Sequence, residues 1–135
     1  MFCFITKKWR TDAMKGGYVD GFVLVVPKKN INAYKKLALL AAKMWKKYGA
    51  LEYIECVGDD LNVPWGAMPF PKLVKTKPGE TVFFSFIVYK SRAHRDSVNA
   101  KLMKDPAMND PEKMKNMPFD MKKMTYGGFK VLVSA

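Results

Sequence analysis

The 135-residue sequence predicts an α+β protein with the order β-α-β-β-α-β, the ferredoxin-like split unit, whose four strands form one antiparallel sheet. Two observations lead to this prediction. Four segments are rich in β-branched and aromatic residues and are bounded by turn signals. Two segments with helical periodicity connect the first strand to the second and the third to the fourth. No Gly- or Ser-rich linker divides residues 14–135, so we expect them to form a single domain.

The first strand and the first helix have clear boundaries. Residues 18–27, YVDGFVLVVP, predict a strand that stops at Pro27. Residues 30–49 predict a helix capped by Asn30 and terminated by Gly49. Its apolar side chains share one face, and five lysines share the opposite one: Lys35, Lys36, Lys43, Lys46 and Lys47.

The second and third strands follow at residues 50–58 and 81–89. The intervening segment, 59–80, contains four prolines and predicts a loop with at most one short helical turn at 72–76. Ser91 is expected to cap the second helix, which ends before Pro106. A short helix near 111–116 and a last strand at 125–134 complete the order.

The first and third strands are apolar at both odd and even positions, as in VDGFVLVV and TVFFSFIV. Two helices cover only one face of a four-stranded sheet, so a monomer exposes the other apolar face to water. Two sheets packed face to face in a twofold-symmetric pair bury it. The alternation therefore predicts a homodimer.

The net charge is +12, and 21 of the 24 basic residues are lysines. Such an excess is typical either of a lysine-rich solvated exterior or of a protein that binds nucleic acid, here through helix 30–49. Lysine forms fewer bidentate phosphate contacts than arginine, and no RNA-binding motif is present. We therefore expect a solvated exterior and keep nucleic-acid binding as the alternative.

Residues 1–13 are expected to be an N-terminal extension, because Met14 begins a second plausible start, MKGGYVDGF. Their apolar residues precede their charges, the reverse of a signal peptide, and no apolar run has the roughly 18 residues of a membrane span. A cytoplasmic protein without membrane contact is the expectation. Cys56 and His94 lack the two further ligands of a zinc site, and Asp59 and Asp60 lack the further ligand spacing of a divalent-metal site, so no metal is predicted. No cofactor is expected either.

Polar residues that interrupt the apolar strands are the first candidates for a site, because a buried polar group needs a partner. They are Asp20, Ser85 and one of Glu52 and Glu55, which point to opposite faces of their strand. A buried carboxylate has a raised pKa and can act as a general acid or base, so Asp20 and Glu55 are catalytic candidates. Ser85 and Glu52 are candidate ligand contacts, and the alternative is a hydrogen-bonded structural role.

The stretch YKSRAHRDSVNAKLMKDP contains the single histidine, His94, in the first turn of its helix. A helix N-terminus and the neighbouring Arg92 and Arg95 favour neutral imidazole, the form that serves as a catalytic base. The alternative is a half-buried histidine that closes the preceding turn. Arg92 and Arg95 are candidate contacts for an anionic ligand, unless Asp96 pairs with them and neutralises the patch.

Long blocks of the chain resemble the YbaA-like bacterial proteins, a family catalogued as a domain of unknown function. The blocks are YVDGFVL, GALEYIECVGDDL, FPKLVKTKPGETVFFSFIVYKSRAHRDSVNAKLMKDP and MPFD followed by YGGFKVLV. The resemblance implies the dimeric α+β barrel superfamily, which includes cofactor-free monooxygenases, haem-degrading enzymes and lactone isomerases. The family has no established active site, so it supplies no catalytic residue.

Together these features predict a homodimer that binds or transforms a small apolar or aromatic metabolite. The space between the sheet and its partner is the expected pocket of a dimeric barrel.

Overall fold

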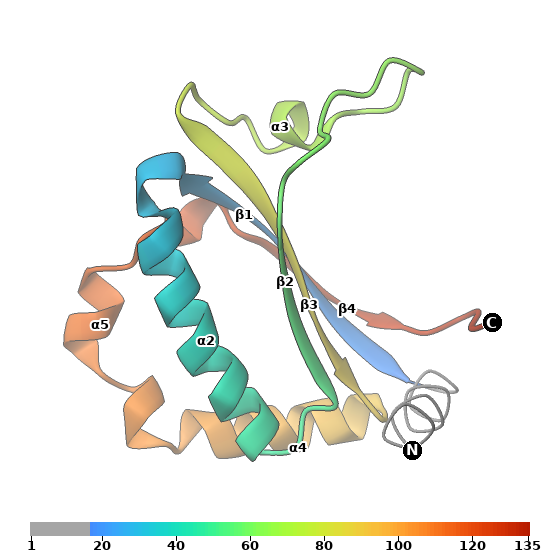
Figure 1. Cartoon of the computed structure of the whole chain (residues 1–135). Helices are drawn as coiled ribbons and strands as arrows, with labels where there is room; N and C mark the ends of the chain where they lie inside the picture. The colour runs from blue at the N-terminus through green and yellow to red at the C-terminus, as the bar shows by residue number, and fades with distance from the viewer. Residues whose placement is uncertain (1–16) are drawn as a thin grey trace, which may run out of the picture.

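A computed structural model describes residues 17–135 (Figure 1). The predicted extension, residues 1–13, lies outside this range. The strands are β1 (Tyr18–Pro27), β2 (Glu52–Val57), β3 (Glu80–Tyr89) and β4 (Thr125–Lys130). They form one antiparallel sheet in the order β2-β3-β1-β4. The ferredoxin-like α+β fold is therefore confirmed.

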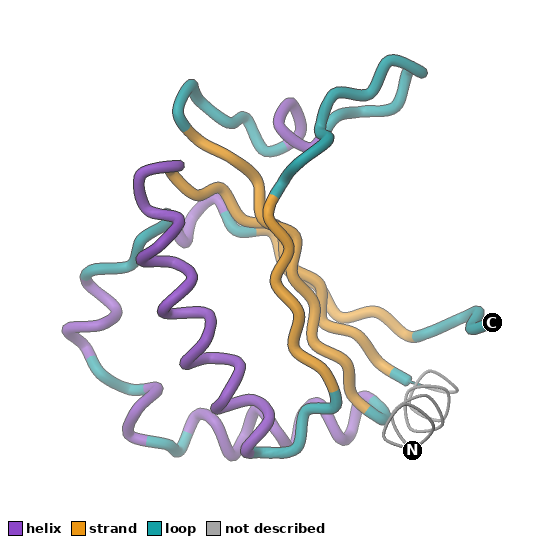
Figure 2. The backbone as a smooth tube through the Cα atoms, viewed as in Figure 1, coloured by secondary structure: helices purple, strands orange, loops and turns teal. Residues whose placement is uncertain are grey.

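The helices are α2 (Ile31–Lys47), α3 (Phe70–Leu73), α4 (Arg92–Met103) and α5 (Pro111–Lys115). Three single 3₁₀ turns accompany them, at Lys28–Asn30, Pro106–Met108 and Met121–Lys123. Figures 1 and 2 show α2, α4 and α5 on one side of the sheet and α3 on the other. We call the side that carries α2 the helix face and the opposite side the open face.

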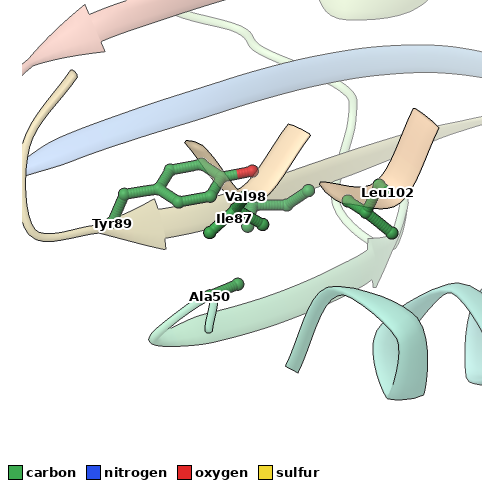
Figure 3. Close-up of a cluster of buried hydrophobic side chains, with 5 residues drawn as sticks. All are labelled: Ala50, Ile87, Tyr89, Val98 and Leu102. Atoms are coloured by element: carbon green, nitrogen blue, oxygen red, sulfur yellow. The ribbon is translucent and has the colours of Figure 1, made fainter. Parts of the chain in front are cut away.

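Two clusters of buried side chains pack between the helix face and the helices. Leu24 and Val26 of β1 pack with Phe83 of β3 and with Tyr34 of α2 on the helix face. The rings of Tyr34 and Phe83 meet edge to face, 4.6 Å apart. A second cluster joins β3 to α4 and to the start of β2 (Figure 3); it contains Ala50, Ile87, Tyr89, Val98 and Leu102.

The helix ends agree with the sequence at two points and differ at one. Ser91 caps α4, because its Oγ accepts a hydrogen bond from the His94 amide at 3.1 Å. Gly49, with φ 110°, ends α2 in a conformation that glycine adopts without strain. Asn30 occupies the predicted N-cap position of α2, but its side chain makes no capping hydrogen bond and donates instead to the Pro118 carbonyl at 3.1 Å.

Two elements have different bounds from those predicted. The short helix α3 begins at Phe70 rather than at 72, because Pro71 in its first turn has a backbone angle suited to a helix start. Strand β4 ends at Lys130 rather than at 134, because Lys130 already pairs with Tyr18, the first residue of β1. Beyond it the Val131 amide donates to the Gly17 carbonyl at 3.0 Å.

The open face is apolar. Alternation places Val19 and Val23 of β1, Phe84 and Phe86 of β3, and Phe129 of β4 on it. These residues line a groove of about 380 Å³. Of the described elements, only α3 lies over this face, at one end of the sheet (Figure 1). Phe84 stays 45% exposed and Phe129 63% exposed within the single chain.

Within residues 17–135, no helix combines the length and the apolar character that crossing a bilayer requires.

Candidate functional site

The polar residues that interrupt the strands lie on the helix face. Glu55 of β2 is opposite Ser85 of β3, Ser85 is opposite Phe22 of β1, and Phe22 is opposite Tyr126 of β4. Asp20 lies on the same face, one alternation along β1 from Phe22. The expected pocket, between the open face and a second copy, is therefore not lined by Asp20, Glu55 or Ser85.

Glu55 is the centre of a hydrogen-bonded group that joins β2 to α2. The Tyr34 hydroxyl donates to Glu55 Oε2 at 2.7 Å, and the Tyr53 hydroxyl donates to Oε1 at 2.9 Å. Tyr53 and Glu55 share a face because they are two residues apart on a strand. Tyr34 reaches them because it belongs to the apolar stripe of α2, which faces the sheet.

The electrostatics of Glu55 favour a bound proton. Burial raises the pKa of its carboxyl, and the hydrogen bonds from Tyr34 and Tyr53 oppose that rise only in part. No cation among residues 17–135 forms an ion pair with it. Burial and the nearby Glu55 raise the pKa of both tyrosines, so their hydroxyls stay protonated and remain donors. A carboxyl with a raised pKa is suited to general acid or base chemistry.

Ser85 and Glu52 lie on opposite faces of the sheet. Ser85 is buried and lies directly opposite Glu55, where its small side chain separates Glu55 from Phe22 across the sheet. Glu52 lies on the open face, as its odd spacing from Glu55 requires. Of the two predicted ligand contacts on these strands, only Ser85 is thus brought beside Glu55.

Asp20 and Arg95 form a separate group with two tyrosines. Arg95 Nη1 lies 2.8 Å from Asp20 Oδ1 and donates to the Tyr126 hydroxyl at 2.8 Å. The guanidinium carbon lies 4.9 Å from the centre of the Tyr18 ring. On its other edge, Arg95 Nε pairs with the exposed Asp96 at 2.7 Å. These contacts fasten α4 to β1 and β4.

The contacts of this second group hold α4 against the sheet. Asp20 is 2% exposed, and its carboxylate already has the Arg95 guanidinium as partner. Burial raises the pKa of Asp20, and Arg95 opposes that rise. Arg92, by contrast, is exposed on the surface of α4. The two arginines predicted to bind an anion therefore have different environments.

His94 belongs to neither the Glu55 group nor the group of Asp20 and Arg95. Its Nδ1 accepts a hydrogen bond from the Lys90 amide at 3.0 Å, and its ring packs edge-on against Tyr89 with centroids 5.8 Å apart. It also approaches the backbone of Gly49, at the end of α2. Tyr34 lies near the start of α2 and Gly49 just after its end, 15 residues further along. At a helical rise of 1.5 Å per residue this separation is roughly 20 Å. His94 and Glu55 thus contact opposite ends of that helix.

The pKa of His94 is lowered, the predicted direction, but the cause differs from the predicted one. Burial contributes most, and the positive charge of Lys90 comes next, while a hydrogen bond to the Gly49 backbone opposes them. Arg95 has no such role because it is paired with Asp20 and Asp96. These contacts place the His94 ring against the turn that follows β3.

The lysine face of α2 is exposed, and some of its charges are already engaged. Lys47 Nζ lies 3.7 Å from Asp105 Oδ2, and Lys46 Nζ donates to the Leu51 carbonyl at 2.8 Å. These contacts hold two of the five lysines against the protein's own surface.

The sequence profile of a family described as "Protein of unknown function (DUF1428)" matches residues 17–121. The chain belongs to this family. It is 44% identical over 117 residues to "Uncharacterized protein YbaA" of Escherichia coli (strain K12), covering 86% of this chain and 97% of that protein. The protein of the same description from Shigella flexneri matches with the same identity and coverage. The DUF1428 match spans the Glu55 group and ends before β4.

The tyrosines are the site residues that sequence reasoning missed in this DUF1428 protein. Tyr53 carries a signal, since a tyrosine two residues before a strand glutamate shares its face. The signal at Tyr34 is weaker: its hydroxyl lies on an apolar helix stripe, and a buried hydroxyl needs a hydrogen-bond partner. Nothing in the sequence around Tyr18 or Tyr126 indicates contact with Arg95, which is more than 30 residues away from both.

Proposed function

We propose that this DUF1428 protein is a homodimer that binds and transforms a small apolar or aromatic metabolite on its helix face, with Glu55 exchanging a proton with the ligand. The observation that carries the proposal is the environment of Glu55. Its carboxyl is half-buried, is held by two tyrosine hydroxyls and has no cationic partner among residues 17–135.

The buried carboxylate of Asp20 has the Arg95 guanidinium as an ionic partner. Glu55 has no such partner in the described part of the chain, and its two tyrosine hydrogen bonds oppose only in part the rise in its pKa that burial causes. A carboxyl with a pKa shifted in this way is typical of functional sites. The surroundings suit an apolar or aromatic ligand, because Phe83 and Phe119 pack around Tyr34.

The homodimer is supported by the open face. Two copies stacked through it remove Phe84 and Phe129 from water without covering the helix face. The five lysines of α2 then point away from the contact on both copies, which limits repulsion between two chains of charge +12.

The proposal is tested by adding a library of planar aromatic fragments, with and without a hydrogen-bonding group, to ¹⁵N-labelled protein and recording amide shifts by NMR. Binding fragments are expected to shift the amides of Tyr34, Tyr53, Glu55 and Ser85. Glu55→Gln should reduce the affinity for fragments that carry the hydrogen-bonding group. The matched control, Glu52→Gln, changes the same strand on the opposite face and should leave that affinity unchanged.

Two results contradict the proposal. One is a set of shifts confined to the open-face groove, and the other is equal affinity in the wild type and Glu55→Gln. Native mass spectrometry of protein purified from its own host complements the library, because a co-purifying small molecule then identifies the ligand class directly.

A further inference from the structure

The segment between β2 and β3, residues 58–79, forms an arm that leaves the sheet and includes α3. Two backbone hydrogen bonds hold its base: Gly58 N–H to the Val82 carbonyl and Lys28 N–H to the Gly79 carbonyl, both 2.8 Å. We call this segment the β2–β3 arm. Figure 1 shows it extending away from the sheet on the side opposite α2.

Large apolar side chains of the arm are exposed in the single chain. Trp65 is 77% exposed, Leu73 62%, Met68 59% and Phe70 42%. Soluble monomers rarely leave more than a few hundred Å² of contiguous apolar surface in water. Tryptophan and methionine are also the residue types enriched where one protein contacts another. The composition of the arm is therefore that of an interface.

The arm and the open face form one continuous apolar surface. The Phe70 ring of α3 packs against the Phe84 ring of β3, with centroids 6.3 Å apart. Phe84 in turn lies 6.0 Å from the Phe86 ring, at the wall of the groove. A partner that covers the open face consequently meets the arm as well.

We propose that the β2–β3 arm crosses to a second copy of this chain and packs its apolar side chains, Trp65 foremost, onto that copy. The inference rests on the homodimer of the proposed function and adds the contact that clasps it. Twofold symmetry makes the exchange reciprocal, so both exposed arms are buried by one association.

The reach of the arm is sufficient for this contact. Stacked sheets lie about 10 Å apart. The seven residues from Gly58 to Trp65 span up to about 25 Å when extended. The arm therefore extends past the plane of the neighbouring sheet even when it is only half extended. A second copy also fits by charge, because the lysine-rich face of α2 lies on the other side of the sheet.

Photo-cross-linking between isotopically distinct copies tests the proposal. The photoreactive residue p-benzoylphenylalanine replaces Trp65 in one preparation, Phe129 on the open face in a second, and the exposed Leu39 of α2 in a third. Each is made with ¹⁴N and with ¹⁵N, mixed, unfolded and refolded together, and then irradiated. Mass spectrometry then identifies cross-linked peptides that join a light chain to a heavy one.

The expected result is mixed light–heavy cross-links from positions 65 and 129 and none from position 39. Mixed cross-links from 129 with only intrachain products from 65 overturn the arm contact and leave the homodimer standing. Mixed products from 65 alone overturn the face-to-face homodimer and, with it, the inference that rests on it. Absence of mixed products at both positions overturns both proposals. Equal cross-linking at 39 and 65 indicates random collision and overturns the arm contact.

A solution measurement complements this test. Replacing both Trp65 and Met68 with serine is expected to raise the dimer dissociation constant at least tenfold, measured by sedimentation velocity over a dilution series. An unchanged dissociation constant overturns the arm contact. Lys72→Ser, a polar change on the same arm, is the control and should leave the dissociation constant within about twofold of the wild type.

Discussion

Gly128→Ala tests the packing that holds Arg95 against the sheet. A Cβ atom at position 128 would lie 2.8 and 2.9 Å from the Cε2 and Cζ ring atoms of Tyr18, and closer still to its hydroxyl. The ring has little room to retreat, because the Arg95 guanidinium lies over it, 4.9 Å from the ring centre. Arg95 is fixed in turn by Asp20 and Tyr126.

The expected cost follows from three effects. Overpacking a filled position costs about 1–3 kcal/mol, and loss of the contact between Arg95 and Tyr18 adds roughly 0.5–1 kcal/mol. The reduced freedom of the unfolded chain returns about 0.4–1 kcal/mol. Gly128→Ala should therefore lower the free energy of unfolding by about 2 kcal/mol.

A double-mutant cycle isolates the cause. Urea unfolding is followed at one fixed chain concentration for the wild type, Gly128→Ala, Tyr18→Ala and the double variant. Without the Tyr18 ring, Gly128→Ala should cost less than about 0.5 kcal/mol, since the atoms it clashes with are gone. An equal cost with and without the ring would refute the reasoning.

Three further predictions concern charge and assembly. Burial raises the pKa of Glu55 above its ordinary value of 4.5, so the folded chain binds the Glu55 proton more tightly than the unfolded chain does. The stability that this proton contributes is present below pH 4.5 and is lost as the pH rises through the folded pKa. The free energy of unfolding of the wild type, relative to that of Glu55→Gln, should therefore fall above pH 4.5, and a rise would contradict the assignment. Burial and Lys90 lower the pKa of His94, so an NMR titration of its ring should give a value below 6.5, whereas a value above 6.5 would refute this environment. Phe84→Asp places a charge on the open face and should convert the dimer to monomer in sedimentation velocity at micromolar concentration; a wild type that sediments as a monomer there would rule out the homodimer.

The regular elements were predictable because their signals are local. Eight of the ten residues of strand β3 are β-branched or aromatic, and the start of α4 is marked by a serine that accepts a hydrogen bond from the amide three residues on. Asn30 occupies the N-cap position without a capping hydrogen bond, because its side chain donates to the Pro118 carbonyl, 88 residues away. No local pattern announces such a competitor.

The candidate site was predictable only in part, for the same reason. Strand alternation separated Glu52 from Glu55 and identified both as interruptions, but it did not show that Glu55 faces the helices. The contact between Tyr34 and Glu55 depends on where α2 crosses β2. The pairing of Asp20 with Arg95 joins positions 75 residues apart. These contacts depend on how whole elements pack, which residue spacing does not encode.

A ¹³C NMR titration of the Glu55 side-chain carboxyl is the decisive measurement for the proton-exchanging role of this residue. A pKa above 4.5 is expected in the wild type, because burial outweighs the two tyrosine hydrogen bonds. A further rise is expected in Tyr34→Phe, because that variant removes a donor that stabilises the carboxylate. A Glu55 pKa at or below 4.5 in the wild type, unchanged in Tyr34→Phe, would contradict the role of Glu55 as the proton-exchanging group.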